Sequence, residues 1–260
     1  MFMRGSPSRG PFPTLSAEWI DVWAVRLLAP ECAVDLFRRI LSPDECARAS
    51  RLRFFALNRS YVISTGSLRA LIGKYLGTDA ARVRFEFGHK GKPRVASNQE
   101  LCFNASHSGS LALFAFTRGC ELGIDLEQIR ILSNVNEIAT QFFCPGEAVQ
   151  LLSLPDSERL HAFFRCWTRK EAYLKATGEG LSASLDQLQV AFRPRDACRI
   201  IHCGNDPSTP QQWALHNLKP APGFAAALAY HRPRRRVRLF GVLEPASLLE
   251  NRYALDAIPS

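Results

Sequence analysis

The sequence predicts an α+β protein built as a pseudo-twofold pair of similar lobes, each a small, mainly antiparallel sheet packed with helices. Two observations lead to this fold class. Helical segments precede a run of short strands in the first half of the chain, and the same order returns in the second half. No repeat is visible at the level of single residues, so the likeness of the two halves is architectural.

The length and composition are those of a globular protein with enough chain for two lobes. Of 260 residues, 47% are hydrophobic and 22% are charged, and no apolar run reaches the roughly 20 residues that span a membrane. We expect a disordered leader (1–16), an N-terminal lobe (17–127), a C-terminal lobe (128–243) and a C-terminal tail (244–260). The leader has no apolar secretion-signal core, so the cytoplasm is the expected location.

Charge and cysteine content restrict the class of partner and the redox state. The formal net charge of +9 suits an anionic partner, whether nucleic acid, a phosphate-bearing cofactor, a membrane surface or an acidic protein. Charge alone does not choose among them. The 8 cysteines form no C-x-x-C pair and no zinc spacing, so free, mostly buried thiols are expected rather than disulfides.

In the first lobe, alternation and capping residues predict the elements. Glu18–Leu28 alternates polar and apolar residues, as a strand does. Ser42, Pro43 and Glu45 match an N-cap, a first-turn proline and a capping box, and so begin a helix. A second helix is expected over Asn58–Leu76. Further strands are expected at Val83–Phe87, Leu101–Ala105, Leu111–Phe116 and Gly123–Glu127, with a basic, glycine-rich turn over Gly88–Pro93.

In the second lobe, three helices precede a series of strands. The helices are expected at Val135–Phe143, Pro145–Leu152 and Ser157–Ala176, the last ended by Gly178. The strands are expected at Leu188–Phe192, Arg199–Cys203, Trp213–Leu218, Phe224–Tyr230 and Val237–Val242. The basic cluster at 231–236 has a solvated surface run as its ordinary interpretation.

Two acids on one strand are the first candidates for chemistry. Asp125 and Glu127 are two residues apart, so both carboxylates point to the same face of the strand. Two neighbouring carboxylates repel each other unless a cation or a proton intervenes. Mg²⁺ would relieve this repulsion, because it binds a few carboxylates and keeps waters and ligand phosphates. Taken alone, such a strand is more often an exposed acidic edge.

The helix at Ser157–Ala176 supplies a further acid and base. Trp167, Glu171 and Lys175 follow at intervals of one helical turn and share a face. Alone, they describe an ordinary amphipathic helix. Together with the acidic strand they describe a site for a metal-bound polyphosphate, with cations to hold developing charge and a carboxylate to take a proton. The cations and polar groups of that site would be Lys90, Lys92, Ser106, His107 and Lys175.

Four motifs in order carry a resemblance to a known family. They are G-K-P (91–93), F-N-A-S-H-S (103–108), G-I-D-L-E (123–127) and W-T-R-K-E-A-Y-L-K-A-T-G-E-G-L (167–181). This set resembles the 4'-phosphopantetheinyl transferases. It is similar to the two-lobe, monomeric type that activates surfactin synthetase rather than to the short trimeric holo-carrier synthases, and it covers about Ser42 to Tyr230.

The resemblance implies a reaction and roles for its acids. The 4'-phosphopantetheine group of coenzyme A would pass to a serine of an acyl or peptidyl carrier protein, with Mg²⁺ bound and 3',5'-ADP released. Asp125, Glu127 and Glu171 resemble the Mg²⁺ ligands. Glu171 is the expected base, directly or through a water, and Glu127 is the second candidate. Lys175 would stabilise the pyrophosphate and the departing 3',5'-ADP.

The resemblance also implies a set of coenzyme A ligands. Ser106 and His107 would hold the 3'-phosphate end, and Lys92 would lie near the adenine and phosphates. Either Arg48 or Arg51 would face the 3'-phosphate. The full expected set is Arg48, Arg51, Lys90, Lys92, Pro93, Ser106, His107, Asp125 and Lys175. Arg169 and Lys170 are expected to be exposed, solvated or facing the carrier, and Trp167 is expected in the core.

Two other functions stay open at this point. One is a nucleic-acid-binding protein that uses Arg232–Arg236 and the arginine-bearing helices, which explains the charge but not the acidic pair. The other is a non-catalytic coenzyme A-binding module. We expect the transferase, with no nucleic acid or membrane partner and as a monomer, because two lobes in one chain can form the site between them. The sequence does not say whether the carrier serves fatty acid, polyketide or nonribosomal peptide synthesis.

Overall fold

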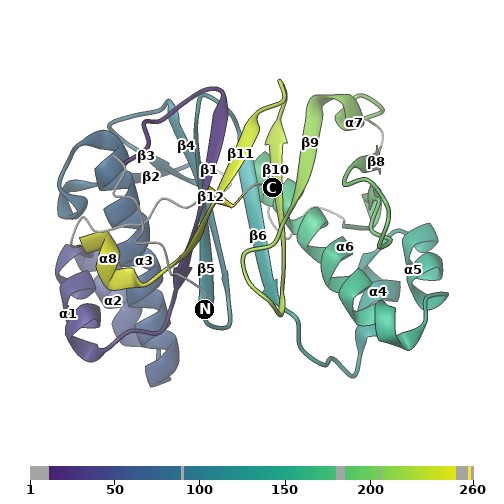
Figure 1. Cartoon of the computed structure of the whole chain (residues 1–260), viewed down its shortest axis with the longest axis horizontal. Helices are drawn as coiled ribbons and strands as arrows, with labels where there is room; N and C mark the ends of the chain where they lie inside the picture. Colours follow the sequence, from purple (N-terminus) through teal and green to yellow (C-terminus); the bar gives the residue numbers. More distant parts are fainter. Residues whose placement is uncertain (1–11, 89–90, 180–184, 205, 250–256, 259–260) are drawn as a thin grey trace, which may run out of the picture.

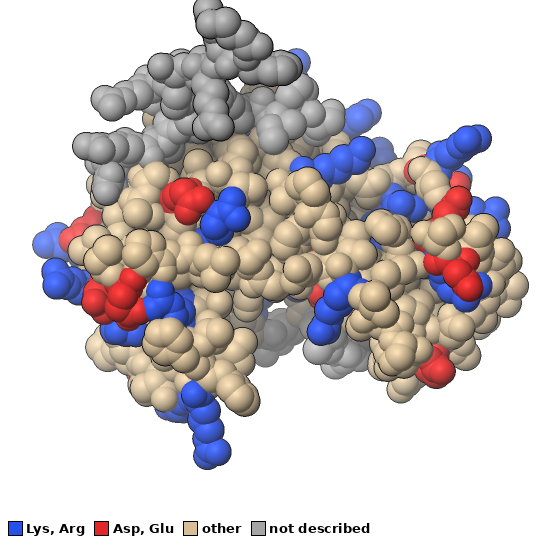
Figure 2. All heavy atoms as spheres, turned by 60° about the horizontal axis from the view of Figure 1, so that its bottom comes forward, with Lys and Arg blue, Asp and Glu red and all other residues tan. Residues whose placement is uncertain are grey.

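The computed structural model describes residues 12–88, 91–179, 185–204, 206–249 and 257–258. Helices lie on two outer sides and strands lie between them, which confirms the α+β class with helices and a sheet in each half (Figure 1). Seen from the bottom of that view, the surface is hollowed between the two halves (Figure 2). None of the described helices is long and apolar enough to cross a membrane.

The elements of the first half begin and end close to the expected residues. The capping box forms: the Ser42 side chain accepts from the Glu45 amide, and the Glu45 side chain accepts from the Ser42 amide. Helix α1 was not expected. The elements are β1 (Trp19–Arg26), α1 (Glu31–Ile40), α2 (Pro43–Arg51), α3 (Phe55–Leu76), the 3-10 turn η1 (Ala80–Arg82), β2 (Phe85–Phe87), β3 (Pro93–Val95), β4 (Leu101–Ser108), β5 (Leu111–Arg118) and β6 (Leu122–Gln128).

The second half contains one long helix and shorter elements around it. Gly178 ends the long helix in the left-handed conformation, with φ of 73°, as expected of a C-terminal glycine. The elements are α4 (Val135–Phe142), α5 (Pro145–Leu152), α6 (Asp156–Thr177), the 3-10 turn η3 (Leu185–Gln187), β7 (Leu188–Val190), β8 (Ile200–Cys203), α7 (Thr209–Gln212), β9 (Trp213–Leu218), β10 (Phe224–His231), β11 (Arg236–Leu243), α8 (Pro245–Leu249) and β12 (Ala257–Ile258).

Two larger sheets organise the molecule, and each contains strands from both halves of the chain. One has the order β12-β11-β1-β5-β4, and the other has the order β6-β10-β9. Strand β11, expected in the C-terminal lobe, pairs in parallel with β1, while β6, expected in the N-terminal lobe, pairs with β10. The expected boundaries at 127 and 243 therefore do not separate the sheets, because strand pairing is non-local and local patterns do not report it.

The core lies in three layers of apolar side chains. Along β1, Trp23 and Val25 face α3 while Val22 and Ala24 face the second sheet, as strand alternation requires. The middle layer joins the two sheets and includes Leu113, Ile124 and Tyr230. The third layer packs α4, α5 and α6 on the second sheet through Phe143, Phe163, Phe164 and Phe192. Strands β1 and β6 are thus covered on both faces.

Two expectations about surface segments change. The leader is not disordered at its end, because the Phe12 ring packs 5.2 Å from the Trp23 ring and 4.8 Å from the Tyr75 ring. In the basic cluster, Arg235 is buried and donates to the Arg118 carbonyl at 3.1 Å, so a solvated run is wrong for this residue. In the tail, Leu248 of α8 is buried. The cysteines are free, as expected, but the expectation that most are buried is wrong, because only Cys120, Cys144 and Cys166 are buried.

Candidate functional site

The close approach of β6 and α6 places the acidic strand beside the helix. Gly123 makes this approach possible: a Cβ added to it would lie 2.2 Å from the Ala172 carbonyl oxygen and 2.3 Å from the Ala176 amide nitrogen. Only glycine fits such a contact between two backbones. Asp125 follows on the same strand and Lys175 lies next to the contact on α6, so the two charged side chains meet.

Lys175 bridges the strand and its neighbour β4. Its ammonium donates to Asp125 Oδ1 at 2.6 Å and to Ser106 Oγ at 3.0 Å, and the Ser106 hydroxyl donates to Asp125 Oδ1 at 3.1 Å. Asp125 is buried, whereas the Lys175 side chain is 30% exposed. Since an ammonium has three N–H groups, one remains for a ligand in addition to these two contacts.

Glu127 and Glu171 complete an acidic cluster around this pair. Burial raises the pKa of Glu171, the neighbouring Asp125 carboxylate raises it further, and the Lys175 ammonium lowers it. Burial also raises the pKa of Glu127, and there a hydrogen bond from the Ser108 hydroxyl, 2.8 Å long, lowers it. The three carboxylates are therefore close enough to repel one another, and one lysine does not neutralise them.

Two oxygens of this cluster lack partners. Asp125 Oδ2 and Glu171 Oε1 are buried and accept no hydrogen bond. Buried carboxylate oxygens without donors are costly, and a hard cation with oxygen ligands would satisfy them. The residues therefore fit Mg²⁺ by charge and by donor type. Among the described residues, no three His, Cys, Asp or Glu side chains yet stand in a metal-binding arrangement, so the carboxylates must rotate to hold an ion.

Ser106 and His107 lie on β4 but face different surroundings. The Ser106 hydroxyl accepts from the Leu126 amide at 3.2 Å in addition to its contacts with Asp125 and Lys175, so its hydrogen-bonding capacity is used within the protein. His107 is exposed. Partial desolvation and, to a smaller extent, the Lys175 ammonium lower the pKa of His107, which favours its neutral form.

Lys92 holds the framework together. Its ammonium donates to Glu121 Oε2 at 2.6 Å, to the Leu122 carbonyl at 3.0 Å and to the Ala176 carbonyl at 2.8 Å. All three N–H groups are used, so the lysine ties the β2–β3 hairpin to β6 and to the end of α6. Pro93 begins β3 opposite Phe87. Lys90, the other expected ligand of this turn, lies outside the described residues.

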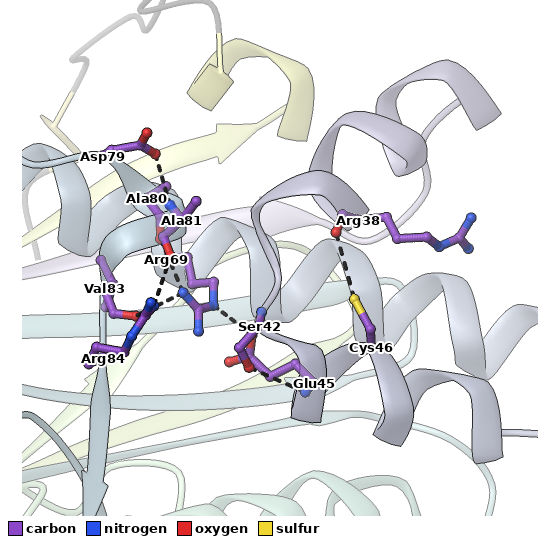
Figure 3. A network of polar contacts seen from close by, with 10 residues as sticks. All are labelled: Arg38, Ser42, Glu45, Cys46, Arg69, Asp79, Ala80, Ala81, Val83 and Arg84. Carbon is purple, nitrogen blue, oxygen red and sulfur yellow. Dashed lines mark hydrogen bonds and ion pairs between the residues drawn. The ribbon is translucent and has the colours of Figure 1, made fainter.

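Arg48 and Arg51 line a separate cavity of about 570 Å³. Arg84, Tyr61, Phe85 and Phe87 also line it, whereas none of its lining residues comes from β4, β6 or α6. At its base, buried Arg69 donates to Glu45 Oε2 at 2.6 Å and to the Ala80 and Val83 carbonyls at 3.1 and 3.0 Å (Figure 3). Glu45 thus both caps α2 and anchors it to α3.

The expectation that Arg169 and Lys170 are exposed is wrong. Lys170 is fully buried and pairs with Glu147 Oε2 at 2.6 Å, and Arg169 is 1% exposed and donates to Asn217 Oδ1 at 2.9 Å. The reason is that elements pack on several sides of α6, including β6, β10 and β7. Trp167 packs in the core as expected, against Phe143 and Phe163.

Sequence reasoning missed four residues of this region. Gly123 sets the spacing of β6 and α6, Ser108 binds Glu127, and Arg84 lines the arginine cavity. Asn104 accepts from the Ile124 amide at 2.9 Å. A signal for two of them was present: in F-N-A-S-H-S, Asn104, Ser106 and Ser108 alternate along a strand and so share one face.

Comparisons with known proteins identify the family of this chain. The model of the 4'-phosphopantetheinyl transferase superfamily matches residues 121–229, which include β6 and α6. The 4'-phosphopantetheinyl transferase HetI of Nostoc sp. is 37% identical over 222 residues, which are 84% of this chain and 90% of that protein. The transferase psf-1 of Bacillus pumilus is 32% identical, over 72% of this chain and 83% of that protein.

Two more matches extend the comparison. The 4'-phosphopantetheinyl transferase Sfp of Bacillus subtilis is 31% identical, over 59% of this chain and 67% of that protein. The solved structure of the holo-[acyl-carrier-protein] synthase of Thermotoga maritima is 19% identical, with a TM-score of 0.32 over 44% of this chain and 64% of that one, a likeness too low to carry an argument. The relatives over most of the chain decide the question: this chain belongs to the 4'-phosphopantetheinyl transferase superfamily, and it is an enzyme that transfers 4'-phosphopantetheine from coenzyme A to carrier protein domains.

Proposed function

We propose that the cluster of Asp125, Glu127, Glu171 and Lys175 is the catalytic centre of a Mg²⁺-dependent transfer. The observation that carries the proposal is the pair of buried, partnerless oxygens, Asp125 Oδ2 and Glu171 Oε1, beside a partly exposed lysine. Asp125, Glu127 and Glu171 would hold the ion, which supplies positive charge to the pyrophosphate of coenzyme A when it is bound.

Glu171 is proposed as the base that takes the proton of the carrier serine. The serine oxygen forms a bond to the β-phosphorus of coenzyme A while the bond from that phosphorus to the bridging pyrophosphate oxygen breaks. The phosphopantetheine becomes a phosphodiester of the serine, and 3',5'-ADP leaves. Glu171 is a carboxylate beside Asp125 and Lys175, and a positioned carboxylate is a group that can take the proton of a hydroxyl nucleophile. Glu127 is the second candidate.

Lys175 is proposed to stabilise the charge that develops on the departing 3',5'-ADP. Its ammonium has one N–H beyond those given to Asp125 and Ser106, and its side chain reaches solvent. A fixed cation next to the leaving group lowers the barrier because it needs little reorganisation during the reaction. The tight contact with Asp125 fixes the position of this cation.

The arginine cavity is proposed to take the 3'-phosphate and adenosine end of coenzyme A. Arg48, Arg51 and Arg84 supply cations for the phosphate, and the rings of Phe85 and Phe87 offer apolar faces to the adenine. Exposed, neutral His107 would donate a hydrogen bond to a phosphate between this cavity and the acidic cluster. In this proposal Lys92 and Pro93 shape the site through the hairpin, and direct contact by Lys90 stays a prediction.

The partner is proposed to be an acidic carrier domain that meets a monomeric enzyme. A net charge of +9 favours encounter with both coenzyme A and such a domain. The nucleic-acid alternative loses support because Arg235 is buried within the fold. On the face shown in Figure 2, basic side chains are spread over the surface rather than gathered in one stripe. We also propose a reducing location, the cytoplasm, because the cysteines are free.

The test of the proposal is a mass measurement on purified apo carrier proteins of several types. With this enzyme, coenzyme A and Mg²⁺, we expect one carrier or more to gain the mass of 4'-phosphopantetheine, and we expect excess chelator to prevent the gain. Asp125→Ala should also prevent it. A gain that survives both chelator and this substitution would contradict the proposed centre, and transfer to no carrier would contradict the activity itself.

A further inference from the structure

A ladder of polar side chains on β4 holds the acidic strand. Strands β4 and β6 belong to different sheets, so no backbone pairing joins them. Instead, three β4 side chains accept hydrogen bonds from alternate amides of β6. The pairs are Asn104 with Ile124 at 2.9 Å, Ser106 with Leu126 at 3.2 Å and Ser108 with Gln128 at 3.0 Å. We call Asn104, Ser106 and Ser108 the polar ladder.

The three members of the polar ladder differ in what else they bind. The hydroxyl of Ser106 also contacts Asp125 and Lys175, and the hydroxyl of Ser108 also contacts Glu127 Oε2 at 2.8 Å. Asn104 Oδ1 accepts from the amide of Ile124, which lies on β6 one residue before Asp125. Ser106 and Ser108 therefore bind both the backbone of β6 and one of its acids. Asn104 binds only the backbone of β6 through its side-chain oxygen.

The Ser108 hydroxyl both accepts and donates a hydrogen bond. The Gln128 amide can only donate, so Ser108 Oγ is the acceptor in that bond. The single hydroxyl hydrogen is then directed to Glu127 Oε2, which must accept it. This hydrogen bond holds Oε2 of Glu127, and Oε1 takes no part in it. Since Glu127 is only half-buried and has a flexible side chain, such a contact is what fixes its orientation.

We propose that Ser108 is a positioning residue that orients Glu127 for the metal ion. This inference rests on the proposed function, in which Glu127 is one of three Mg²⁺ ligands. A group that hydrogen-bonds a metal-ligating carboxylate restricts the rotation of its side chain, so that only a small adjustment is needed when the ion binds, and loss of such a group costs metal affinity. Ser108 acts through Glu127 and has no role of its own in the transfer of the phosphopantetheine.

The chain offers matched variants that separate orientation of the carboxylate from support of the strand. Ser108→Ala removes the contact with Glu127 and the acceptor for the Gln128 amide. Ser108→Thr keeps the hydroxyl and should restore the contact. Asn104→Ala removes the acceptor for the Ile124 amide, a comparable loss to the strand, and that hydrogen bond involves no carboxylate. A role confined to strand support predicts the same behaviour for Ser108→Ala and Asn104→Ala.

The experiment is a calorimetric titration of Mg²⁺ into each protein saturated with coenzyme A, with thermal unfolding measured in parallel. We expect Ser108→Ala to bind Mg²⁺ roughly 10-fold more weakly or worse, Ser108→Thr to lie within about threefold of wild type, and Asn104→Ala to keep wild-type affinity at a lower Tm. In transfer assays, Ser108→Ala should regain most of its rate as the Mg²⁺ concentration is raised.

Other results overturn the inference in distinguishable ways. If Ser108→Ala binds Mg²⁺ as tightly as wild type, or if Asn104→Ala weakens binding equally, Ser108 does not position Glu127, while the proposed catalytic centre stands. If wild type itself binds no Mg²⁺ in the presence of coenzyme A, both the inference and the proposed metal site are wrong. Retained transfer by wild type at saturating chelator would likewise contradict both.

Discussion

Two neighbouring residues of α6, Lys170 and Glu171, belong to two buried charged groups that are built differently. Lys170 pairs with Glu147, and every polar group of that pair is used. Glu147 Oε1 accepts from the Val190 amide at 2.7 Å, Oε2 accepts from the Cys144 amide at 3.0 Å, and Lys170 also donates to the Leu185 and Leu188 carbonyls. In the other group, Asp125 Oδ2 and Glu171 Oε1 have no partner.

The comparison shows that burial alone does not mark a reactive residue. The Glu147–Lys170 pair joins α5, α6 and the segment around β7, and its hydrogen bonds offset the cost of burying charge. In the second group, three acids and one lysine leave negative charge and acceptor oxygens in excess. A buried carboxylate oxygen without a hydrogen-bond donor is costly unless another group compensates its charge. A bound cation with its phosphate ligand provides that compensation.

The largest difference between the groups should be in turnover. We expect Glu171→Gln to lower the rate of transfer about 100- to 10,000-fold, because the amide cannot take the serine proton. Its affinity for coenzyme A should change only a few-fold. Single-turnover kinetics with an apo carrier and a binding titration measure the two effects separately. A rate near that of wild type would remove Glu171 from the role of base.

The next largest effect concerns the stability that depends on the Glu147–Lys170 pair. Lys170→Met should lower the free energy of unfolding by about 3 to 5 kcal/mol, because it leaves Glu147 buried without its cation. Denaturant unfolding measures this loss. The double variant Lys170→Met with Glu147→Leu is the control, and it should recover part of the loss because no charge is left buried. If Lys170→Met is as stable as wild type, the Glu147–Lys170 pair does not stabilise the fold.

A substitution at Gly123 should disturb one group and spare the other. Gly123→Ala places a Cβ 2.2 Å from the Ala172 carbonyl and must push α6 away from β6, at a cost of about 1 to 3 kcal/mol. Transfer should fall with it, since Asp125 and Lys175 separate. The control is Gly146→Ala on α5, where an added Cβ meets nothing within 4 Å. Equal behaviour of the two variants in unfolding and transfer would contradict the proposed role of the close approach.

The smallest expected effect is a gain in stability with a definite pH dependence. Because the native pKa of Glu171 is raised, its ionisation disfavours the native state, and stability falls as pH rises through the window from the unfolded to the native pKa. Glu171→Gln should therefore stabilise the ligand-free protein at pH 8 and much less at pH 4. Thermal unfolding without Mg²⁺ measures it. A loss of stability at pH 8 would show that the ionised carboxylate is already compensated.

Local patterns in the sequence predicted the parts of the site that lie along single elements. Alternation placed Asp125 and Glu127 on one face, helical spacing placed Glu171 and Lys175 one turn apart, and the capping box at Ser42 formed. These features depend on residues a few positions apart, and the structure keeps them.

The features that the sequence did not predict depend on which elements pack together. Helical spacing could not show that β7 covers the Lys170 side of α6, so that lysine was expected at the surface. The contacts by which Lys92 anchors the hairpin were not predicted, because its three acceptors come from segments far along the chain. The buried position of Arg235 and the pairing of β11 with β1 have the same origin.

The central claim is that the partnerless carboxylate oxygens beside Lys175 bind the metal ion of the reaction. The most direct test is a crystal of the enzyme grown with coenzyme A and Mn²⁺, with the ion located by its anomalous scattering. We predict one peak at the acidic cluster, coordinated by Asp125 Oδ2 and Glu171 Oε1 and by Glu127. A crystal with bound coenzyme A and no peak at these oxygens, or with the ion held elsewhere, would contradict the claim.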